Sequence, residues 1–125
     1  MARLHRVARF VAPIALGMFA LPACAHSSLV SSTPTDKSQV FAPATIELTF
    51  SETLVPQFST ARLIMPGMPN HEAIQSHIQI SGAGDGKTMV ITPARPLHAG
   101  NYRVEWRAVS SDTHPITGNI TFQVK

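Results

Sequence analysis

Residues 102–107 read Tyr-Arg-Val-Glu-Trp-Arg, an alternation of apolar and charged side chains with a period of two. Because successive side chains of a β-strand point to opposite faces, this stretch predicts a half-buried strand with Tyr102 and Trp106 on its inner face. Residues 45–50 and 120–124 alternate in the same way. These three segments indicate a protein built from strands that each cover a core with one face.

Four weaker strand candidates lie elsewhere in the chain, at residues 28–32, 61–65, 77–80 and 88–92. Prolines and glycines separate the strand candidates from one another. Residues 82–86 are rich in glycine and predict a hairpin loop. With no long helical period and no internal repeat, the sequence predicts one all-β domain of about seven strands, an antiparallel sandwich or a Greek-key barrel.

The first 25 residues have the pattern of a cleavable signal peptide. Three arginines precede an apolar run over residues 10–21, and Ala23-Cys24-Ala25 has the small-x-small form of a cleavage site. We expect a secreted protein of residues 26–125 that begins at His26. The alternative is a lipoprotein box, residues 21–24, in which Cys24 is acylated and retained; Pro22 fits such a box poorly.

Charge and cysteine usage exclude several classes of function. The chain has 10 basic and 7 acidic residues, but the leader holds three arginines and no acid, which leaves 7 of each in residues 26–125. A neutral chain without a basic patch argues against nucleic acid as a partner. The leader run is too short to span a membrane, so no membrane insertion is expected after cleavage. Without cysteine beyond Cys24, disulfides and thiolate metal sites are also excluded.

A terminal histidine can chelate a metal by itself, because its free α-amine and its imidazole belong to one residue. Cu(II) favours such nitrogen and oxygen donors in a tetragonal arrangement. Asp112 and His114, two residues apart, are candidates to complete a site with His26, although an Asp-x-His pair alone is more often structural. Glu52, at the end of the 45–50 strand, is an axial or second-sphere candidate, or simply a charged residue at a strand end.

A second cluster consists of Met65, Met68 and His71 at three-residue spacing. Thioethers are soft donors that suit Cu(I), although Met65 can equally end a strand in the core and Met68 can be plain loop. His77 and His98 have no companions at ligand spacing and are interpreted as surface histidines. No G-x-S-x-G, H-E-x-x-H or phosphate-binding glycine loop is present, so catalysis finds little support.

The residues of three stretches resemble the CopC/PcoC family of periplasmic copper-resistance proteins. The stretches are the opening at His26 with residues 29–34, residues 46–52, and the long run 102–118, Tyr-Arg-Val-Glu-Trp-Arg-Ala-Val-Ser-Ser-Asp-Thr-His-Pro-Ile-Thr-Gly. The resemblance implies a seven-stranded Greek-key β-barrel or sandwich, immunoglobulin-like or cupredoxin-like, that binds copper and is not an enzyme.

The resemblance also implies a ligand set and partners. Cu(II) would be held by the amine and imidazole of His26 with Asp112 and His114, and with Glu52 close by. Some family members carry a separate Cu(I) site in a Met-rich loop; here that loop is short, so a weaker Cu(I) site is expected, or His71 replaces a carboxylate at Cu(II). The sequence leaves open whether the protein stores copper, delivers it to an inner-membrane copper transporter or passes it to a periplasmic copper oxidase.

Two other functions remain open on the sequence. A terminal histidine paired with a second histidine also forms the copper centre of lytic polysaccharide monooxygenases, but no aromatic platform for a glycan is visible, and Asp112 would occupy the oxygen position. The other is an immunoglobulin-like interaction module in which metal binding is incidental. The loop from Met65 to His71 would be its candidate docking face.

Overall fold

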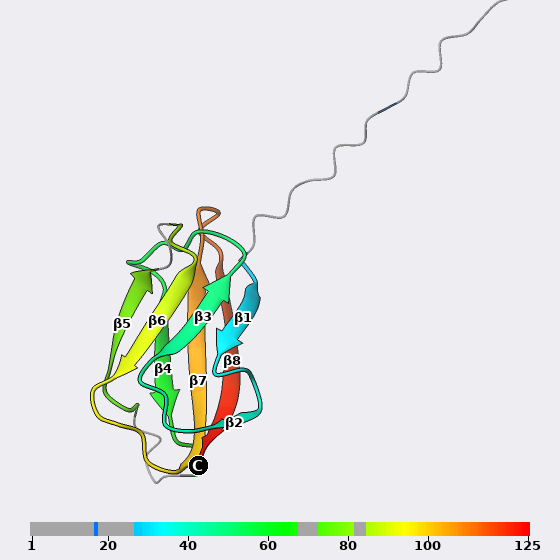
Figure 1. Ribbon diagram of the computed structural model, residues 1–125. Helices are drawn as coiled ribbons and strands as arrows, with labels where there is room; N and C mark the ends of the chain where they lie inside the picture. Colours follow the sequence, from blue (N-terminus) through cyan, green and yellow to red (C-terminus); the bar gives the residue numbers. More distant parts are fainter. Residues whose placement is uncertain (1–16, 18–26, 68–72, 82–84) are drawn as a thin grey trace, which may run out of the picture.

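Two four-stranded sheets pack face to face in the computed structural model, which describes residues 17, 27–67, 73–81 and 85–125. One sheet has the strand order β1-β3-β6-β5 and the other β2-β8-β7-β4 (Figure 1). The strands are β1 (Leu29–Thr33), β2 (Ser38–Val40), β3 (Ile46–Phe50), β4 (Thr60–Ile64), β5 (Ser76–Ser81), β6 (Thr88–Pro93), β7 (Gly100–Val109) and β8 (Pro115–Val124).

The all-β prediction is confirmed, and each of the seven expected strands is present. Of the two arrangements left open, the molecule adopts the sandwich. The strand count was wrong by one, because β2 makes an eighth strand that runs parallel to β8. With three residues, Ser-Gln-Val, β2 is too short to show an alternation that sequence reasoning could detect.

The core lies between the sheets, where the alternating side chains of both inner faces meet. Trp106 on β7 packs edge-on against Phe50 on β3, with ring centroids 5.0 Å apart. Tyr102, also on β7, stacks on Phe122 of β8 at 5.5 Å. Its hydroxyl donates a hydrogen bond to the His98 carbonyl at 2.7 Å. Burial raises the pKa of Tyr102 above 10.0 and outweighs the opposing effect of that hydrogen bond.

The directions of the strands decide which loops and strand ends lie together at each end of the sandwich. The beginning of β1 and the loop between β7 and β8 lie at one end, and the end of β4 lies at the other, near the C-terminus (Figure 1). β5 and β6, which flank the predicted glycine-rich hairpin loop, pair antiparallel from Ser81↔Thr88 onward. None of the described residues forms a helix that could cross a membrane. The predicted leader, apart from Gly17, lies outside the described residues.

Candidate metal site

The loop after β7 places Asp112 and His114 close together. Ser110 forms a β-bridge with Leu54, and the Thr113 amide then donates to the Ser110 carbonyl at 3.0 Å, which closes a tight turn. Thr113 takes a φ of 63°, a left-handed conformation that β-branched residues rarely adopt. The reversal brings the residues on either side of Thr113 together.

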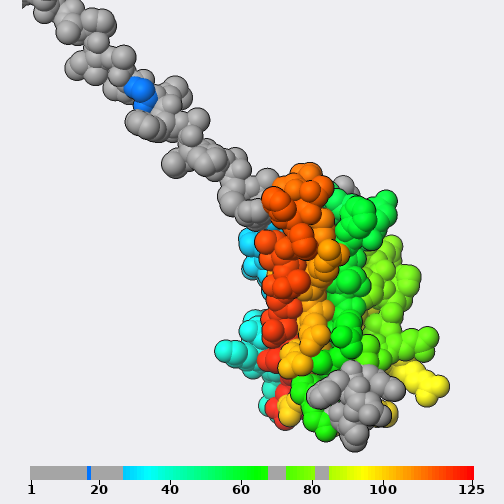
Figure 2. All heavy atoms as spheres, turned by 180° about the vertical axis from the view of Figure 1, so that it is seen from behind, coloured from blue at the N-terminus to red at the C-terminus, as the bar shows by residue number. Residues whose placement is uncertain are grey.

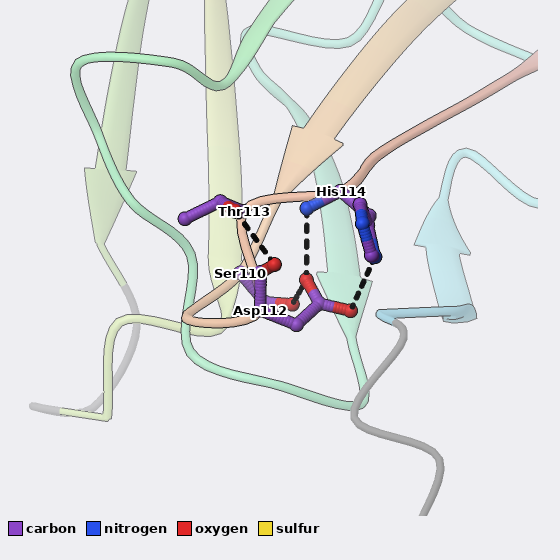
Figure 3. Close-up of polar contacts among 4 residues, drawn as sticks. All are labelled: Ser110, Asp112, Thr113 and His114. Atoms are coloured by element: carbon purple, nitrogen blue, oxygen red, sulfur yellow. Dashed lines mark hydrogen bonds and ion pairs between the residues drawn. The ribbon is translucent and has the colours of Figure 1, made fainter.

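One carboxylate oxygen of Asp112 holds this turn in shape. Oδ1 accepts hydrogen bonds from the Ser110 hydroxyl and from the His114 amide, each at 3.1 Å (Figure 3). A short polar side chain that bonds an amide two residues ahead is the usual way in which Asp stabilises a turn. The orientation of the carboxylate is therefore determined by the loop itself.

The other oxygen faces the imidazole. Asp112 Oδ2 lies 3.9 Å from His114 Nδ1, too far apart for a hydrogen bond. First-row divalent ions bind nitrogen and oxygen ligands at roughly 2.0–2.2 Å, so one ion between the two atoms can contact both. The Asp112 side chain is 16% exposed and that of His114 is 72% exposed. The pair thus combines an oriented carboxylate with an imidazole that solvent can reach.

The segment from Ser51 to Val55 joins this loop to the beginning of β1. At one end, the Ser28 amide donates to Ser51 Oγ at 3.0 Å and the Ser51 amide donates to the Ser28 carbonyl at 2.9 Å. At the other end, the Val55 amide donates to the Val109 carbonyl at 2.7 Å. A single five-residue segment therefore contacts both Ser28 and the end of β7.

Glu52 belongs to this connecting segment and is half-buried. It follows Ser51, the residue that pairs with Ser28, and so lies at the same end of the sandwich as Asp112 and His114. A role for Glu52 beside the ion stays a prediction.

The remaining predicted Cu(II) ligand, His26, lies outside the described residues. Ser27, the next residue, is described and is buried. Within the described ranges, no cluster of three or more His, Cys, Asp or Glu residues could hold a metal ion. The described part of the candidate site is therefore the pair Asp112 and His114.

Met65 lies far from this pair. An added Cβ on Gly100, the first residue of β7, would come within 2.8 Å of Met65 Cε. Nine residue steps separate Gly100 from Val109, which corresponds to about 30 Å at the usual rise of a strand. Met65 is only half-buried, at the core margin. Met68 and His71 lie outside the described residues.

Two serines that the sequence did not indicate hold parts of the candidate site in place. Ser110 is buried and bonds the Asp112 carboxylate, and Ser51 fixes the beginning of β1. Both stand beside a predicted acid in the sequence, but serine–acid neighbours are common and carry little information by themselves. His77 and His98 are exposed, as expected of surface histidines.

Comparison with known proteins gives a consistent result. Residues 29–125 match the family model of the CopC domain. The chain is 59% identical over 119 residues to the copper resistance protein C of Pseudomonas syringae pv. tomato, covering 93% of this chain and 94% of the relative. It is 52% identical over 109 residues to the protein of the same name from Escherichia coli, covering 85% and 86%.

A solved structure matches as well. The crystal structure of PcoC, a methionine-rich copper resistance protein from Escherichia coli, superimposes with a TM-score of 0.72 at 54% identity, covering 81% of this chain and all of that one. The match to the family model spans every strand described above. The chain therefore belongs to the CopC domain family.

Proposed function

We propose that this protein binds copper and serves in copper resistance or homeostasis by sequestering the ion or handing it on. Membership of the CopC domain family supports the proposal, as do the names of relatives from two bacteria, both copper resistance protein C. Copper here is cargo, and the protein acts by binding without catalysis.

The proposed Cu(II) site consists of the amine and imidazole of His26 with Asp112 and His114, and with Glu52 close by. The observation that carries this proposal is the connecting segment, which bonds Ser28 at one end and the end of β7 at the other. That arrangement brings the chain two residues after the proposed terminus to the Asp112–His114 end of the sandwich. Nitrogen and oxygen donors of this kind favour Cu(II) over Zn(II).

A second, weaker site for Cu(I) is proposed at Met65, Met68 and His71. Thioether donors suit the softer ion, and Met65 follows the end of β4 and lies beside Gly100, at the other end of β7 from Asp112 and His114. The distance of Met65 from the Asp112–His114 pair supports a separate Cu(I) site, and His71 at Cu(II) stays the alternative. With two methionines in the loop, weak Cu(I) binding is expected.

The remaining parts of the proposal concern location and partners. Residues 1–25 would direct the chain to the periplasm and be removed there, because cleavage is what creates the terminal amine. An inner-membrane copper transporter or a periplasmic copper oxidase would receive the ion.

The test begins with protein purified from the periplasm of a bacterial host. Its intact mass, measured with and without one equivalent of Cu(II), reports the cleavage point and the stoichiometry together. Mass corresponding to residues 26–125 plus one copper is the expected result. A chain that keeps leader residues ahead of His26 and still binds one Cu(II) with unchanged affinity would refute the ligand set.

Matched variants separate this site from adventitious binding. His114→Ala should weaken Cu(II) binding at least tenfold, whereas His77→Ala, which removes an exposed histidine on β5, should leave it unchanged. An extra alanine placed ahead of His26 should weaken binding as much as His114→Ala. Copper-dependent peroxide formation with a reductant and oxidised sugar products would instead favour the oxygenase function.

A further inference from the structure

The outer face of the β2-β8-β7-β4 sheet carries an excess of positive charge over its β4, β7 and β8 strands. Trp106 and its alternate neighbours point into the core, so the residues between them point outward. Among the outward positions of these three strands, the charged residues are Arg62, Arg103, Arg107 and Glu105. The face therefore has three guanidinium groups and one carboxylate, although residues 26–125 contain equal numbers of basic and acidic residues. Figure 2 is turned toward this face.

A hollow of about 390 Å³ opens on this face. Its outward side chains form two rows across three strands, as the strand register shows. One row is Thr60, Arg107 and Thr117, and the other is Arg62, Glu105 and Asn119. The hollow is thus lined by two arginines, one acid and small polar groups, with Ala61, Gly118 and the mostly buried Trp106 between the two rows.

Glu105 is the single carboxylate among the three arginines of this face, and it pairs closely with Arg103 and more loosely with Arg62. Its Oε1 lies 3.1 Å from Arg103 Nη2, but its Oε2 lies 3.9 Å from Arg62 Nη1. The Arg62 side chain is 58% exposed, and exposed pairs of this kind contribute little binding energy. Arg107 donates one N–H to the Phe58 carbonyl at 2.9 Å, and a guanidinium has five N–H groups. Both arginines of the hollow therefore keep donors for an added carboxylate.

The spacing of the arginines indicates the form of the ligand. Arg62 lies opposite Glu105, so it is a diagonal neighbour of both Arg103 and Arg107, at about 7–8 Å. In an extended peptide, side chains on one face recur every second residue, about 7 Å apart. Guanidinium groups bind carboxylates in a bidentate, planar geometry.

We propose that this face binds an extended acidic segment of a partner protein, with carboxylates at alternate residues seated on Arg62 and Arg107. Arg107 precedes Ser110 by three strand residues, about 10 Å along β7, so the docked partner would lie beside the candidate metal site. The binding itself does not depend on copper.

The test uses metal-free protein and an acetylated, amidated octapeptide of alternating Glu and Thr. Binding is followed through the backbone amide resonances of the ¹⁵N-labelled protein. Shift changes should centre on Arg62, Arg107 and their neighbours across β4, β7 and β8. The affinity should fall as ionic strength rises. Shift changes centred on the β1-β3-β6-β5 sheet would overturn the proposal.

Matched controls test charge and spacing separately. Arg62→Gln with Arg107→Gln should weaken binding about five- to tenfold, whereas Lys87→Gln with Arg95→Gln, which removes the same charge elsewhere, should change it less than twofold. An octapeptide with its four Glu residues in one block should bind more weakly than the alternating one. Equal losses in both double variants, equal binding of both peptides, or tighter binding of an oligothymidylate would each refute it. Because no copper is present, these outcomes are independent of the Cu(II) proposal.

Discussion

The proposed Cu(II) site gives the two oxygens of the Asp112 carboxylate different roles, one in the turn and one as a ligand. Oδ1 accepts from the Ser110 hydroxyl and the His114 amide, and Oδ2 faces the imidazole. An asparagine can reproduce the first role, because its amide oxygen accepts the same two bonds, but it lacks the negative charge. The two roles can therefore be separated by one substitution.

Asp112→Asn should keep the turn and lose metal affinity. We expect the free energy of unfolding to change by less than about 1 kcal/mol, since the turn bonds remain. The Kd for Cu(II) should rise at least about tenfold, as expected when a carboxylate donor is removed. The control is Asp85→Asn: Asp85 Oδ1 accepts the Lys87 amide at 3.0 Å in another turn, and its loss should leave Cu(II) binding unchanged. Unaltered affinity in Asp112→Asn would exclude this carboxylate as a ligand.

The proposed donors also predict a strong dependence on pH. Amines and imidazoles bind metals only when deprotonated, and these groups ordinarily titrate near 7.7–8.0 and 6.5. Protons therefore compete with Cu(II), and affinity falls as pH falls. The amine alone accounts for about tenfold per pH unit, so the apparent affinity should drop at least about a hundredfold between pH 7 and pH 5. Competition titrations at several pH values measure this, and a constant affinity would contradict the amine–imidazole ligand set.

At the scale of elements, the strands could be predicted from the sequence and the connections between them could not. The alternation in residues 102–107 identified β7 and its inner face, since a period of two is a local property. The contact between Ser28 and Ser51 spans 23 residues and depends on β1 pairing with β3. The Asp-x-His spacing likewise predicted Asp112 and His114 as candidate ligands, but it gave no sign of Ser110, whose burial depends on its bridge to Leu54.

The Ser28–Ser51 contact is itself testable. Ser51→Ala removes the acceptor of the Ser28 amide and the partner of the Ser28 hydroxyl, at 3.0 and 3.2 Å. Both bonds are exposed, so the stability loss should be small, about 0.5–1 kcal/mol. Amide hydrogen exchange at Ser28 and Leu29 should accelerate, and Cu(II) affinity should fall several-fold because Ser28, two residues after the proposed ligand His26, would be held less firmly. Ser31→Ala, an exposed β1 position, is the control. Unchanged exchange at Ser28 would show that β1 is fixed by its other bonds alone.

At the scale of the whole molecule, the two longest strands, β7 and β8, run from one end of the sandwich to the other, and a side chain on β7 contacts the opposite sheet. β7 and β8 pair over their full length, from Gly100↔Val124 to Val109↔Pro115. The candidate Cu(II) site and Met65 thus lie at opposite ends of one rigid hairpin. The same hairpin holds Trp106, whose edge-on contact with Phe50 crosses to the other sheet.

Gly118 makes that packing feasible. It lies opposite Trp106 in the register, and a Cβ there would collide with the indole ring. Gly118→Ala should therefore push the ring toward Phe50. Alanine lowers the conformational entropy of the unfolded chain, which by itself would stabilise the protein by about 0.4–1 kcal/mol. Overpacking a core costs about 1–3 kcal/mol, so the clash should dominate. We expect a net loss of about 1–2 kcal/mol in urea unfolding, with altered emission from the single tryptophan of the chain. Gln123→Ala, an exposed position on β8, should cost less than about 0.5 kcal/mol. Equal stability of the two variants would mean that the indole can move aside without strain, and that the contact between the sheets at Phe50 is looser than its geometry indicates.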